Sequence, residues 1–290
     1  MTLIVSCVTK DAIHHVSDRR ISLVDASGAA YATDHDDYNK LVVFRGWMAF
    51  SFSGSTAIGS SATEEWLVRT LAAAPTSAQG TDLHWLAKYL EERASIEVSR
   101  MPAARKDATR IVFQAVGWVN LLNLNKRVGF ILTVHNALDE GTFHWLPKAK
   151  ARFSSRLKVV EPLPAEGYFL MTAGQPLKAH DHIGLHRAVQ QCVATPAATS
   201  ADLGAVLAGQ MIQFGHDVGY PTIGPGGMLV SIPSVAVRPH EQTIVNGLPL
   251  PDMSTWLYFS GSGEPDRYQH GPHLAGHNGN CYRIAGSYSD

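Results

Sequence analysis

The residue best suited to do chemistry is Thr2, which directly follows Met1. An initiator methionine is normally removed before a small residue, so we expect the mature chain to begin at Thr2. A free N-terminal threonine carries a nucleophile and a base in one residue, because its hydroxyl attacks while its own α-amine accepts the proton. Such an amine has a pKa of about 7.7–8.0, close to working pH. Thr2 therefore predicts hydrolysis through a covalent intermediate.

A nucleophile at this position has to be held by the strands that follow it. Residues 3–8 and 13–17 are β-rich runs separated by a turn at 10–12, and 40–44 and 47–52 form a second predicted hairpin that turns at Arg45-Gly46. The segment between these hairpins, 31–38, is polar and typical of a loop. The first fifty residues therefore predict two hairpins that begin at the nucleophile.

Helices and further strands follow. Apolar spacing predicts a helix over 55–73, with Ile58, Trp66, Leu67 and Leu71 on one face, and a second helix from Thr81-Asp82 to about Met101. We expect strands at 110–119, 127–134, 168–172, 228–232 and 255–259, and helices at 177–194 and 201–217. The tail from Ser260, rich in Gly, His and Pro, is expected to loop over the surface or fray.

This order of elements predicts an α+β fold. Strands, two helices, strands, two helices and strands favour two antiparallel sheets flanked by helix pairs, a four-layer αββα sandwich, over single crossovers between parallel strands. The chain shows no internal repeat and no linker. We expect one domain over residues 1–240 and a C-terminal extension over 241–290 that contains a possible last strand.

The first 75 residues resemble the proteasome β subunits, which are N-terminal-nucleophile (Ntn) hydrolases. The stretch from Thr2 through Lys10-Asp11 to Ser17-Asp18-Arg19-Arg20 is similar to their first hairpin. By this resemblance, Asp18 stands at the conserved acidic position and Lys40, in Asn39-Lys40-Leu41, matches the catalytic lysine. Gly54, in Ser53-Gly54-Ser55, matches the glycine that supplies the backbone oxyanion donor. The resemblance implies the Ntn-hydrolase fold.

Other positions depart from the family's pattern. Leu3 is bulkier than the residue that usually follows the nucleophile, and Gln175 replaces a serine that helps the nucleophile's amine. The resemblance gives Asp217 the role of a second catalytic acidic residue, but the serine expected just beyond it is missing, with Thr222 a candidate in its place. The tail after about residue 239 has no counterpart in the family.

The function predicted from the resemblance is a threonine-type amidohydrolase, foremost a peptidase. Thr2 forms the acyl-enzyme, Lys40 tunes its amine, Asp18 holds Lys40 and the Gly54 N–H stabilises the oxyanion. Two alternatives stay open: an acylase acting on a small amide, and a non-catalytic scaffold subunit. Under the last, Thr2 is an ordinary strand residue behind a retained Met1, and Asp18 and Lys40 form a structural ion pair.

Histidines and cysteines raise competing hypotheses. His14 and His15 would point to opposite faces of a strand and so cannot share a metal, whereas His182 and His186 lie on one face of a helix at i,i+4. There is no HExxH motif, no GxSxG elbow for a Ser-His-Asp triad and no CxxC pair. Cys7, inside a strand, is more typical of core than of a nucleophile. We expect no metal and no cofactor.

Composition excludes several classes of protein. A 45% hydrophobic share and 17% charged residues indicate a packed globule, and a net charge of −1 gives no bulk attraction to nucleic acid or an anionic membrane. No apolar run reaches the roughly 18 residues of a membrane helix. With three scattered cysteines and no signal peptide, we expect a cytoplasmic protein. Its partners would be a peptide or small-amide substrate and further copies of itself; the resemblance implies a ring.

Overall fold

The computed structural model describes residues 2–24, 30–35, 38–44, 48–74, 83–121, 126–140, 145–161 and 163–234, and five strand segments beyond them, 244–245, 248–249, 255–259, 269–275 and 281–286. At 23–24, 30–35, 120–121, 126 and beyond 234, only the backbone is described. The expected turn at Arg45-Gly46 and the helix start at Thr81-Asp82 lie outside the described residues.

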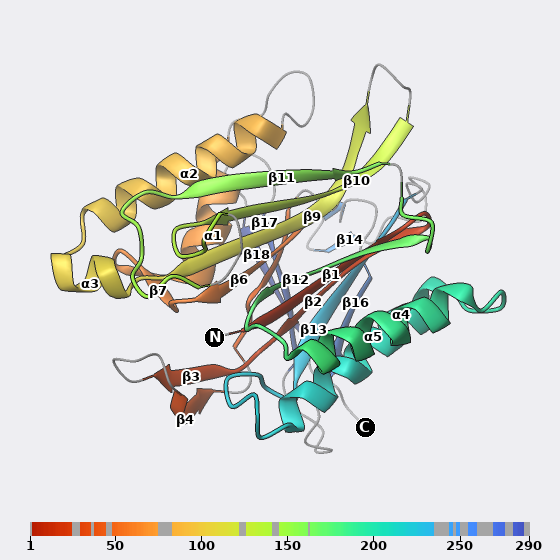
Figure 1. The fold of residues 1–290 in the computed structure, drawn as a ribbon. Helices are drawn as coiled ribbons and strands as arrows, with labels where there is room; N and C mark the ends of the chain where they lie inside the picture. The colour runs from red at the N-terminus through yellow and green to blue at the C-terminus, as the bar shows by residue number, and fades with distance from the viewer. Residues whose placement is uncertain are drawn as a thin grey trace.

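The chain order alternates groups of strands with pairs of helices (Figure 1). The first half contains β1 (Leu3–Thr9), β2 (Ala12–Asp18), β3 (Ile21–Val24), β4 (Ala30–His35), β5 (Leu41–Phe44), β6 (Met48–Gly54), β7 (Ala57–Ile58), β8 (Ser61–Ala62), α1 (Thr63–Ala72), α2 (Leu83–Ser99) and α3 (Ala103–Ala108). The second half contains β9 (Ile111–Leu121), β10 (Lys126–His135), β11 (Ser154–Val160), β12 (Tyr168–Gly174), α4 (Ala179–Ala194), α5 (Ser200–His216), β13 (Gly227–Pro233), β14 (Ile244–Val245), β15 (Leu248–Pro249), β16 (Thr255–Phe259), β17 (Gln269–Ala275) and β18 (Cys281–Gly286).

The first sheet has the order β12-β1-β2-β13-β16, and every neighbouring pair is antiparallel. Strand β1 lies inside this sheet, so both of its edges are hydrogen-bonded. Its first residue, Leu3, pairs with Gly174, the last residue of β12. The end of β12 is therefore brought beside Thr2.

The second sheet has the order β11-β10-β9-β6-β5-β17-β18. The expected antiparallel arrangement holds for most of it, but β17 pairs with β5 in parallel. Strand β6 ends at Gly54, opposite Ile111 at the start of β9. The molecule is thus α+β, built on two large sheets that are antiparallel except for this pair.

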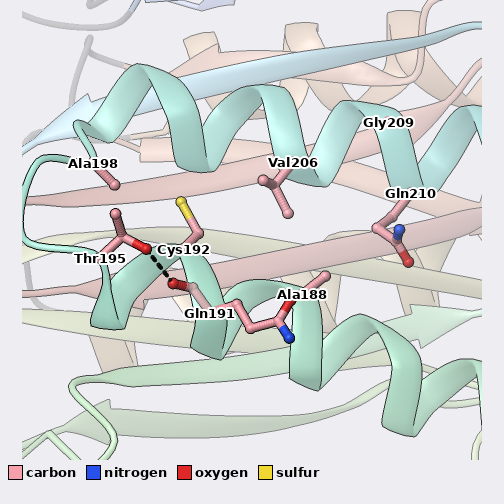
Figure 2. A pocket seen from close by; sticks show the side chains of 8 residues that line it. All are labelled: Ala188, Gln191, Cys192, Thr195, Ala198, Val206, Gly209 and Gln210. Atoms are coloured by element: carbon pink, nitrogen blue, oxygen red, sulfur yellow. Dashed lines mark hydrogen bonds between the residues drawn. The ribbon is translucent and has the colours of Figure 1, made fainter.

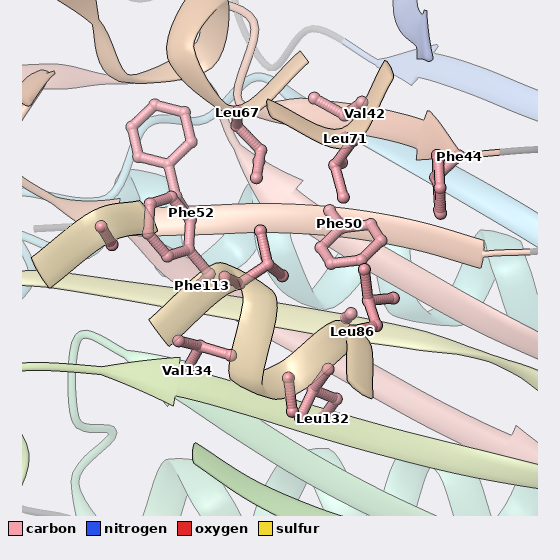
Figure 3. Close-up of a cluster of buried hydrophobic side chains, with 14 of the residues drawn as sticks. Val42, Phe44, Phe50, Phe52, Leu67, Leu71, Leu86, Phe113, Leu132 and Val134 are labelled. Carbon is pink, nitrogen blue, oxygen red and sulfur yellow. The ribbon is translucent and has the colours of Figure 1, made fainter. Parts of the chain in front are cut away.

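Three apolar clusters account for the packing. The first lies between α1, α2 and the second sheet, and Figure 3 shows Phe50, Phe52 and Phe113 of the sheet meeting Leu67 and Leu86 of the helices. The second lies between α4, α5 and the first sheet. The third lies between the two sheets, where residues such as Val8, Ile13, Val116 and Val230 meet. The side chains of each sheet divide between an outer cluster and the central one because successive side chains of a strand face opposite sides of the sheet.

Two expected elements differ in their bounds or type. The helix expected from Ser55 begins at Thr63 instead, because Gly59, with φ +62°, turns the small β7–β8 hairpin before it. The polar segment 31–38, expected to be a loop, contributes β4, which pairs with β3. The expected strands at 110–119, 127–134, 168–172 and 228–232 and the helices at 177–194 and 201–217 agree with the structure to within two residues at most ends.

The C-terminal segments join both sheets. Strand β16 pairs with β13 in the first sheet, as expected for a strand at 255–259. The expectation that the tail beyond Ser260 only loops over the surface is wrong, because β17 and β18 extend the second sheet next to β5. Residues far from the N-terminus therefore complete the sheet that contains Lys40's neighbour Leu41.

Candidate active site at Thr2

Thr2 lies where the two sheets meet, and only 3% of its surface is exposed. Its backbone nitrogen donates to Ser53 Oγ at 3.0 Å, and Ser53 Oγ donates to the Thr2 carbonyl oxygen at 3.0 Å. The same carbonyl accepts from the Gln175 N–H at 2.8 Å. Thr2 is therefore held by β6 of one sheet and by the end of β12 in the other.

The side chain of Thr2 faces a buried lysine. Lys40 Nζ donates to Thr2 Oγ1 at 2.5 Å and to the carbonyl oxygen of Arg20, and it lies 3.5 Å from Asp18 Oδ1. Lys40 is 3% exposed and Asp18 is fully buried. An ammonium at this position polarises the hydroxyl and would lower the pKa of a free amine on the same residue.

Asp18 is anchored by the backbone around it. Its Oδ2 accepts from the Leu3 N–H at 2.6 Å, and its Oδ1 accepts from the N–H groups of Arg20 at 2.9 Å and Gly224 at 3.4 Å. Burial raises the pKa of the Asp18 carboxyl, while Lys40 and the N–H groups of Leu3 and Arg20 oppose that rise. Because Asp18 binds the residue after Thr2 and also Lys40, it aligns the hydroxyl with the ammonium.

Two glycines with left-handed backbone flank this cluster. Gly54, next to Ser53, has φ +105°, and a Cβ there would lie 1.9 Å from the Arg110 carbonyl oxygen. Gly174 has φ +84°, and a Cβ there would lie 1.9 Å from the Thr2 carbonyl oxygen and 2.6 Å from Ser53 Oγ. Only glycine allows such close approach in these conformations, so both positions are fixed by the packing at Thr2.

A second loop closes the site from the side of α5. Thr222 Oγ1 donates to Gln175 Oε1 at 2.8 Å, and the Arg20 guanidinium donates to the Pro221 carbonyl at 3.3 Å. Gln175, which replaces the serine of the resemblance, thus links Thr2 to Thr222. Asp217 lies apart from this link: it accepts from the Gly219 N–H at 2.7 Å and pairs with Lys178 Nζ at 3.6 Å.

The structure brings together four of the five residues expected in the site, because Lys40 contacts both Thr2 and Asp18 and Gly54 adjoins Ser53. In the described part of the chain, Asp217 contacts Lys178 and Gly219 rather than any of these four. Sequence reasoning missed the roles of Ser53 and Gly174. Their signal was present in Ser53-Gly54 and Gly174-Gln175, two glycine-containing strand ends, but only the folded chain shows that both meet Thr2.

The competing residues have other partners. His14 Nδ1 contacts Ser231 Oγ and His15 Nδ1 contacts Ser6 Oγ, both at 2.8 Å, on opposite faces of β2. Burial lowers the pKa of His14 to about 4 and that of His15 to about 3. Burial also raises the pKa of the Cys7 thiol to about 12, which keeps it protonated. No group of three His, Cys, Asp or Glu that could hold a metal occurs among the described residues.

A surface groove lies away from Thr2. It has a volume of about 490 Å³ and runs between α4 and α5, where Figure 2 shows Cys192 and Val206 on facing helices. None of the residues that line it belongs to the Thr2 cluster. In the part of the chain that the structure describes, no helix is long and apolar enough to cross a membrane.

Several solved structures are similar to this chain, among them two ancestral β-subunits. "Anbu (ancestral beta-subunit) from Yersinia bercovieri" is 12% identical, with a TM-score of 0.46 over 80% of this chain and 82% of that chain. An "Anbu (Gly-1) mutant from Hyphomicrobium sp. strain MC1" is 12% identical, with a TM-score of 0.49 over 91% of this chain and 90% of that chain. No family model and no curated protein matches the chain.

These comparisons correct the family expected from the sequence. The neighbours are ancestral β-subunits, a proteasome-like but distinct family, and no model of an Ntn-hydrolase family matches. Assignment of the chain to the proteasome β-subunit type is therefore wrong. The physical reason is that the resemblance rested on a few residues within the first 75 positions, which different families can share. At 12% identity the likeness assigns no activity.

Proposed function

We propose that this protein is a hydrolase that cleaves amide bonds through an acyl-enzyme on Thr2. One observation carries the proposal: Lys40 Nζ lies 2.5 Å from Thr2 Oγ1 and 3.5 Å from Asp18 Oδ1, with all three residues buried. A buried ion pair is costly to maintain unless its geometry is excellent. The three N–H donors of Lys40 are directed to Thr2 Oγ1, the Arg20 carbonyl oxygen and Asp18, so the buried charge is held directly against the hydroxyl that would act as the nucleophile.

The reaction requires the α-amine of Thr2, so the residue before Thr2 has to be released. The freed amine takes the proton from Oγ1 as Oγ1 attacks the substrate carbonyl. We assign the Gly54 N–H as the donor that stabilises the oxyanion, since Gly54 directly follows Ser53, whose hydroxyl contacts both the nitrogen and the carbonyl oxygen of Thr2. The protonated amine then gives its proton to the leaving amine, which leaves an ester on Thr2.

Water completes the cycle. The Thr2 amine, neutral again, removes a proton from a water molecule, and the resulting hydroxide attacks the ester carbonyl. The C–O bond to Oγ1 breaks, Oγ1 recovers its proton, and a carboxylic acid is released. Lys40 stabilises the negative charge that develops on Oγ1, and Asp18 keeps Lys40 in place.

A peptide is the first candidate substrate, and a small amide is the second. The second is favoured by the 3% exposure of Thr2, because a nucleophile with so little exposed surface suits a small acyl group. In support of an Ntn-hydrolase architecture, the clusters place α1 and α2 on one sheet, α4 and α5 on the other, and a third apolar layer between the sheets. We propose that these form the four-layer αββα stack of such enzymes.

We also propose that the protein acts as a homo-oligomer. Trp66 does not support this, since it is 7% exposed and stacks on Phe113 in the core. Trp85, 36% exposed, stacks on Tyr89 at the surface of α2, and Ile96 on the same helix is 41% exposed. Light scattering of the purified protein tests the proposal, and a monomeric mass at micromolar concentration would exclude it.

The proposed reaction is tested by mass spectrometry and covalent labelling together. The N-terminal peptide of the purified protein should begin at Thr2, and an electrophile that requires both a hydroxyl and a neighbouring amine should add one equivalent to it. Thr2→Ala should lose the label and all hydrolysis of fluorogenic amides, while Thr2→Ser retains part of both. Wild-type hydrolysis in Thr2→Ala would exclude the mechanism.

A further inference from the structure

Arg110 lies against one of the two glycines at the site. Its carbonyl oxygen accepts from the Ser55 N–H at 2.8 Å and occupies the space that a Cβ on Gly54 would need. The next residue, Ile111, pairs with Gly54 and points into the cluster under α1 and α2. Arg110 itself precedes β9, and its guanidinium reaches the Trp145 ring and the Leu146 carbonyl oxygen.

Trp145 is attached to the other glycine. Its indole Nε1 donates to the Gly174 carbonyl oxygen at 2.6 Å. Gly174 is the residue on which a Cβ would collide with the Thr2 carbonyl oxygen and Ser53 Oγ. Trp145 therefore contacts Gly174 at the end of β12, and Gly174 packs against Thr2. Arg110, just before β9, contacts Gly54 in the same way.

The two side chains meet. The Arg110 guanidinium carbon lies 5.9 Å from the centroid of the Trp145 ring, and Arg110 NH1 donates to the Leu146 carbonyl oxygen at 3.4 Å. Both residues are half-buried. A cation on an aromatic face is held in orientation by the ring quadrupole. Together, Arg110 and Trp145 form a bridge, here called the Arg110–Trp145 bridge, from Gly54 to Gly174 beside Thr2.

The bridge places a positive charge beside the two glycines that flank the Thr2 cluster. Within the described residues, Asp18 pairs with Lys40 and no carboxylate forms an ion pair with Arg110. A guanidinium has five N–H donors in a planar fork that matches a carboxylate. One of these donors is bonded to the Leu146 carbonyl oxygen. The other N–H groups can donate to a negatively charged group of another molecule.

We propose that Arg110 is a specificity-determining residue, and that the substrate carries a carboxylate beside the scissile amide. The guanidinium binds that carboxylate, and Trp145 holds the guanidinium in place from the Gly174 side. This inference rests on the proposed function and adds the substrate class to it: acidic peptides or acyl amides rather than neutral or basic ones.

The chain contains a matched control for the bridge. Arg127 lies over the ring of Trp118, also with its guanidinium carbon 5.9 Å from the centroid, and its NH1 donates to the Ser234 carbonyl oxygen at 2.8 Å. This second arginine–tryptophan pair lies at the opposite end of the β9–β10 ladder from Ile111. It therefore has the same chemistry without proximity to Thr2.

The experiment compares fluorogenic peptide amides that differ only by Glu against Gln, at the residue on either side of the scissile bond. For the wild-type protein, kcat/KM should be about tenfold higher for Glu than for Gln in at least one pair, as expected for a charge-assisted hydrogen bond. Arg110→Gln should reduce that ratio to about one. Trp145→Phe, which keeps a ring and loses the N–H to Gly174, should lower the ratio part of the way, and Arg127→Gln should keep it.

Each outcome decides the inference. A wild-type ratio near one in both pairs, or a ratio unchanged by Arg110→Gln, would overturn it while hydrolysis itself and the labelling of Thr2 stand. Equal loss of the ratio in Arg127→Gln would also overturn it, since the effect would then be general. If no peptide is hydrolysed and the electrophile does not label wild-type Thr2, the proposed function fails, and this inference with it.

Discussion

Ser53 holds Thr2 at two atoms of one residue: its hydroxyl accepts from the Thr2 nitrogen and donates to the Thr2 carbonyl oxygen, both at 3.0 Å. A single serine on β6 thereby fixes the head of β1 across the gap between the sheets. The orientation of the Thr2 hydroxyl toward Lys40 depends on this contact, because Thr2 precedes the first ladder pair of β1.

Ser53→Ala should therefore lower the rate of amide hydrolysis by about tenfold to a hundredfold, since small misplacements of reacting groups are costly. It should lower the free energy of unfolding by about 1 kcal/mol. Ser55→Ala is the control, because Ser55 Oγ makes an exposed contact with the Ala108 carbonyl at 3.4 Å. Steady-state kinetics and urea unfolding measure both, and equal rates for the two variants would contradict the role of Ser53.

Lys40→Met should reduce the rate by roughly 10²-fold, the scale of a positioned acid–base partner. It should also move the rising limb of the pH–rate profile to higher pH. A nearby positive charge lowers the pKa of an amine, so removing Lys40 raises the pKa of the Thr2 amine and delays formation of the neutral base.

The control for this prediction is Lys10→Met, because Lys10 is 82% exposed and pairs only with the exposed Asp11 at 4.0 Å. Its rate and profile should match those of the wild-type protein. Circular dichroism checks that Lys40→Met is folded, since the substitution leaves Asp18 without its ammonium. A folded Lys40→Met with an unshifted profile would remove Lys40 from the mechanism.

Gly174→Ala should unfold at lower urea concentration and lose hydrolysis. The new Cβ would lie 1.9 Å from the Thr2 carbonyl oxygen, and φ +84° adds a backbone cost of about 1–2 kcal/mol for a residue with a side chain. Gly184→Ala, inside α4 with nothing within 4 Å of its Cβ, should instead stabilise the protein by about 0.5–1 kcal/mol. If Gly174→Ala keeps wild-type stability, the packing described at Thr2 is wrong.

His14 should make the protein less stable in acid. Burial lowers its folded-state pKa from 6.5 to about 4, so between these values the unfolded chain binds a proton that the folded chain does not. The contribution is absent above pH 6.5 and destabilises increasingly as pH falls toward 4. His14→Gln, which cannot titrate, should lose less stability than wild type between pH 7 and pH 4.5. Denaturant unfolding at each pH measures the stability of the wild-type protein and of His14→Gln. Equal losses of stability in the two proteins would contradict the role given to His14.

Much of the site was readable from spacing along the chain. Thr2 was expected to act from its place after Met1, and Asp18 and Lys40 were expected beside it from their match to a family pattern; in the structure Lys40 contacts both Thr2 and Asp18. Asp217 was placed by analogy alone, and it contacts Lys178 and Gly219. The function of this constellation remains a proposal, and the family drawn from it was wrong.

Other features depend on tertiary structure that no local pattern encodes. Strand β11 was missed although Arg156 and Lys158 alternate with Leu157 and Val159, the pattern of an edge strand with one exposed face. Strand β17 was missed because glycine, proline and histidine dominate its sequence, and β18 was missed because it lies in a tail that was expected to form loops. The contact of Gly174 with Thr2 forms only when β12 lies beside β1, and the 158 residues between these strands carry no local signal of that pairing.

The pairing of β1 with β12 can form only after both strands have been synthesised. Leu3 cannot meet Gly174 until the ribosome has made both, which at 5–20 residues per second takes about ten to thirty seconds after the N-terminus is made. During that interval Thr2 has no partner from β12 and is accessible to a processing enzyme; once the sheet closes, it is 3% exposed. For the proposed reaction, the preceding residue would therefore have to be removed from the nascent chain, and an affinity tag fused before Thr2 would block the amine.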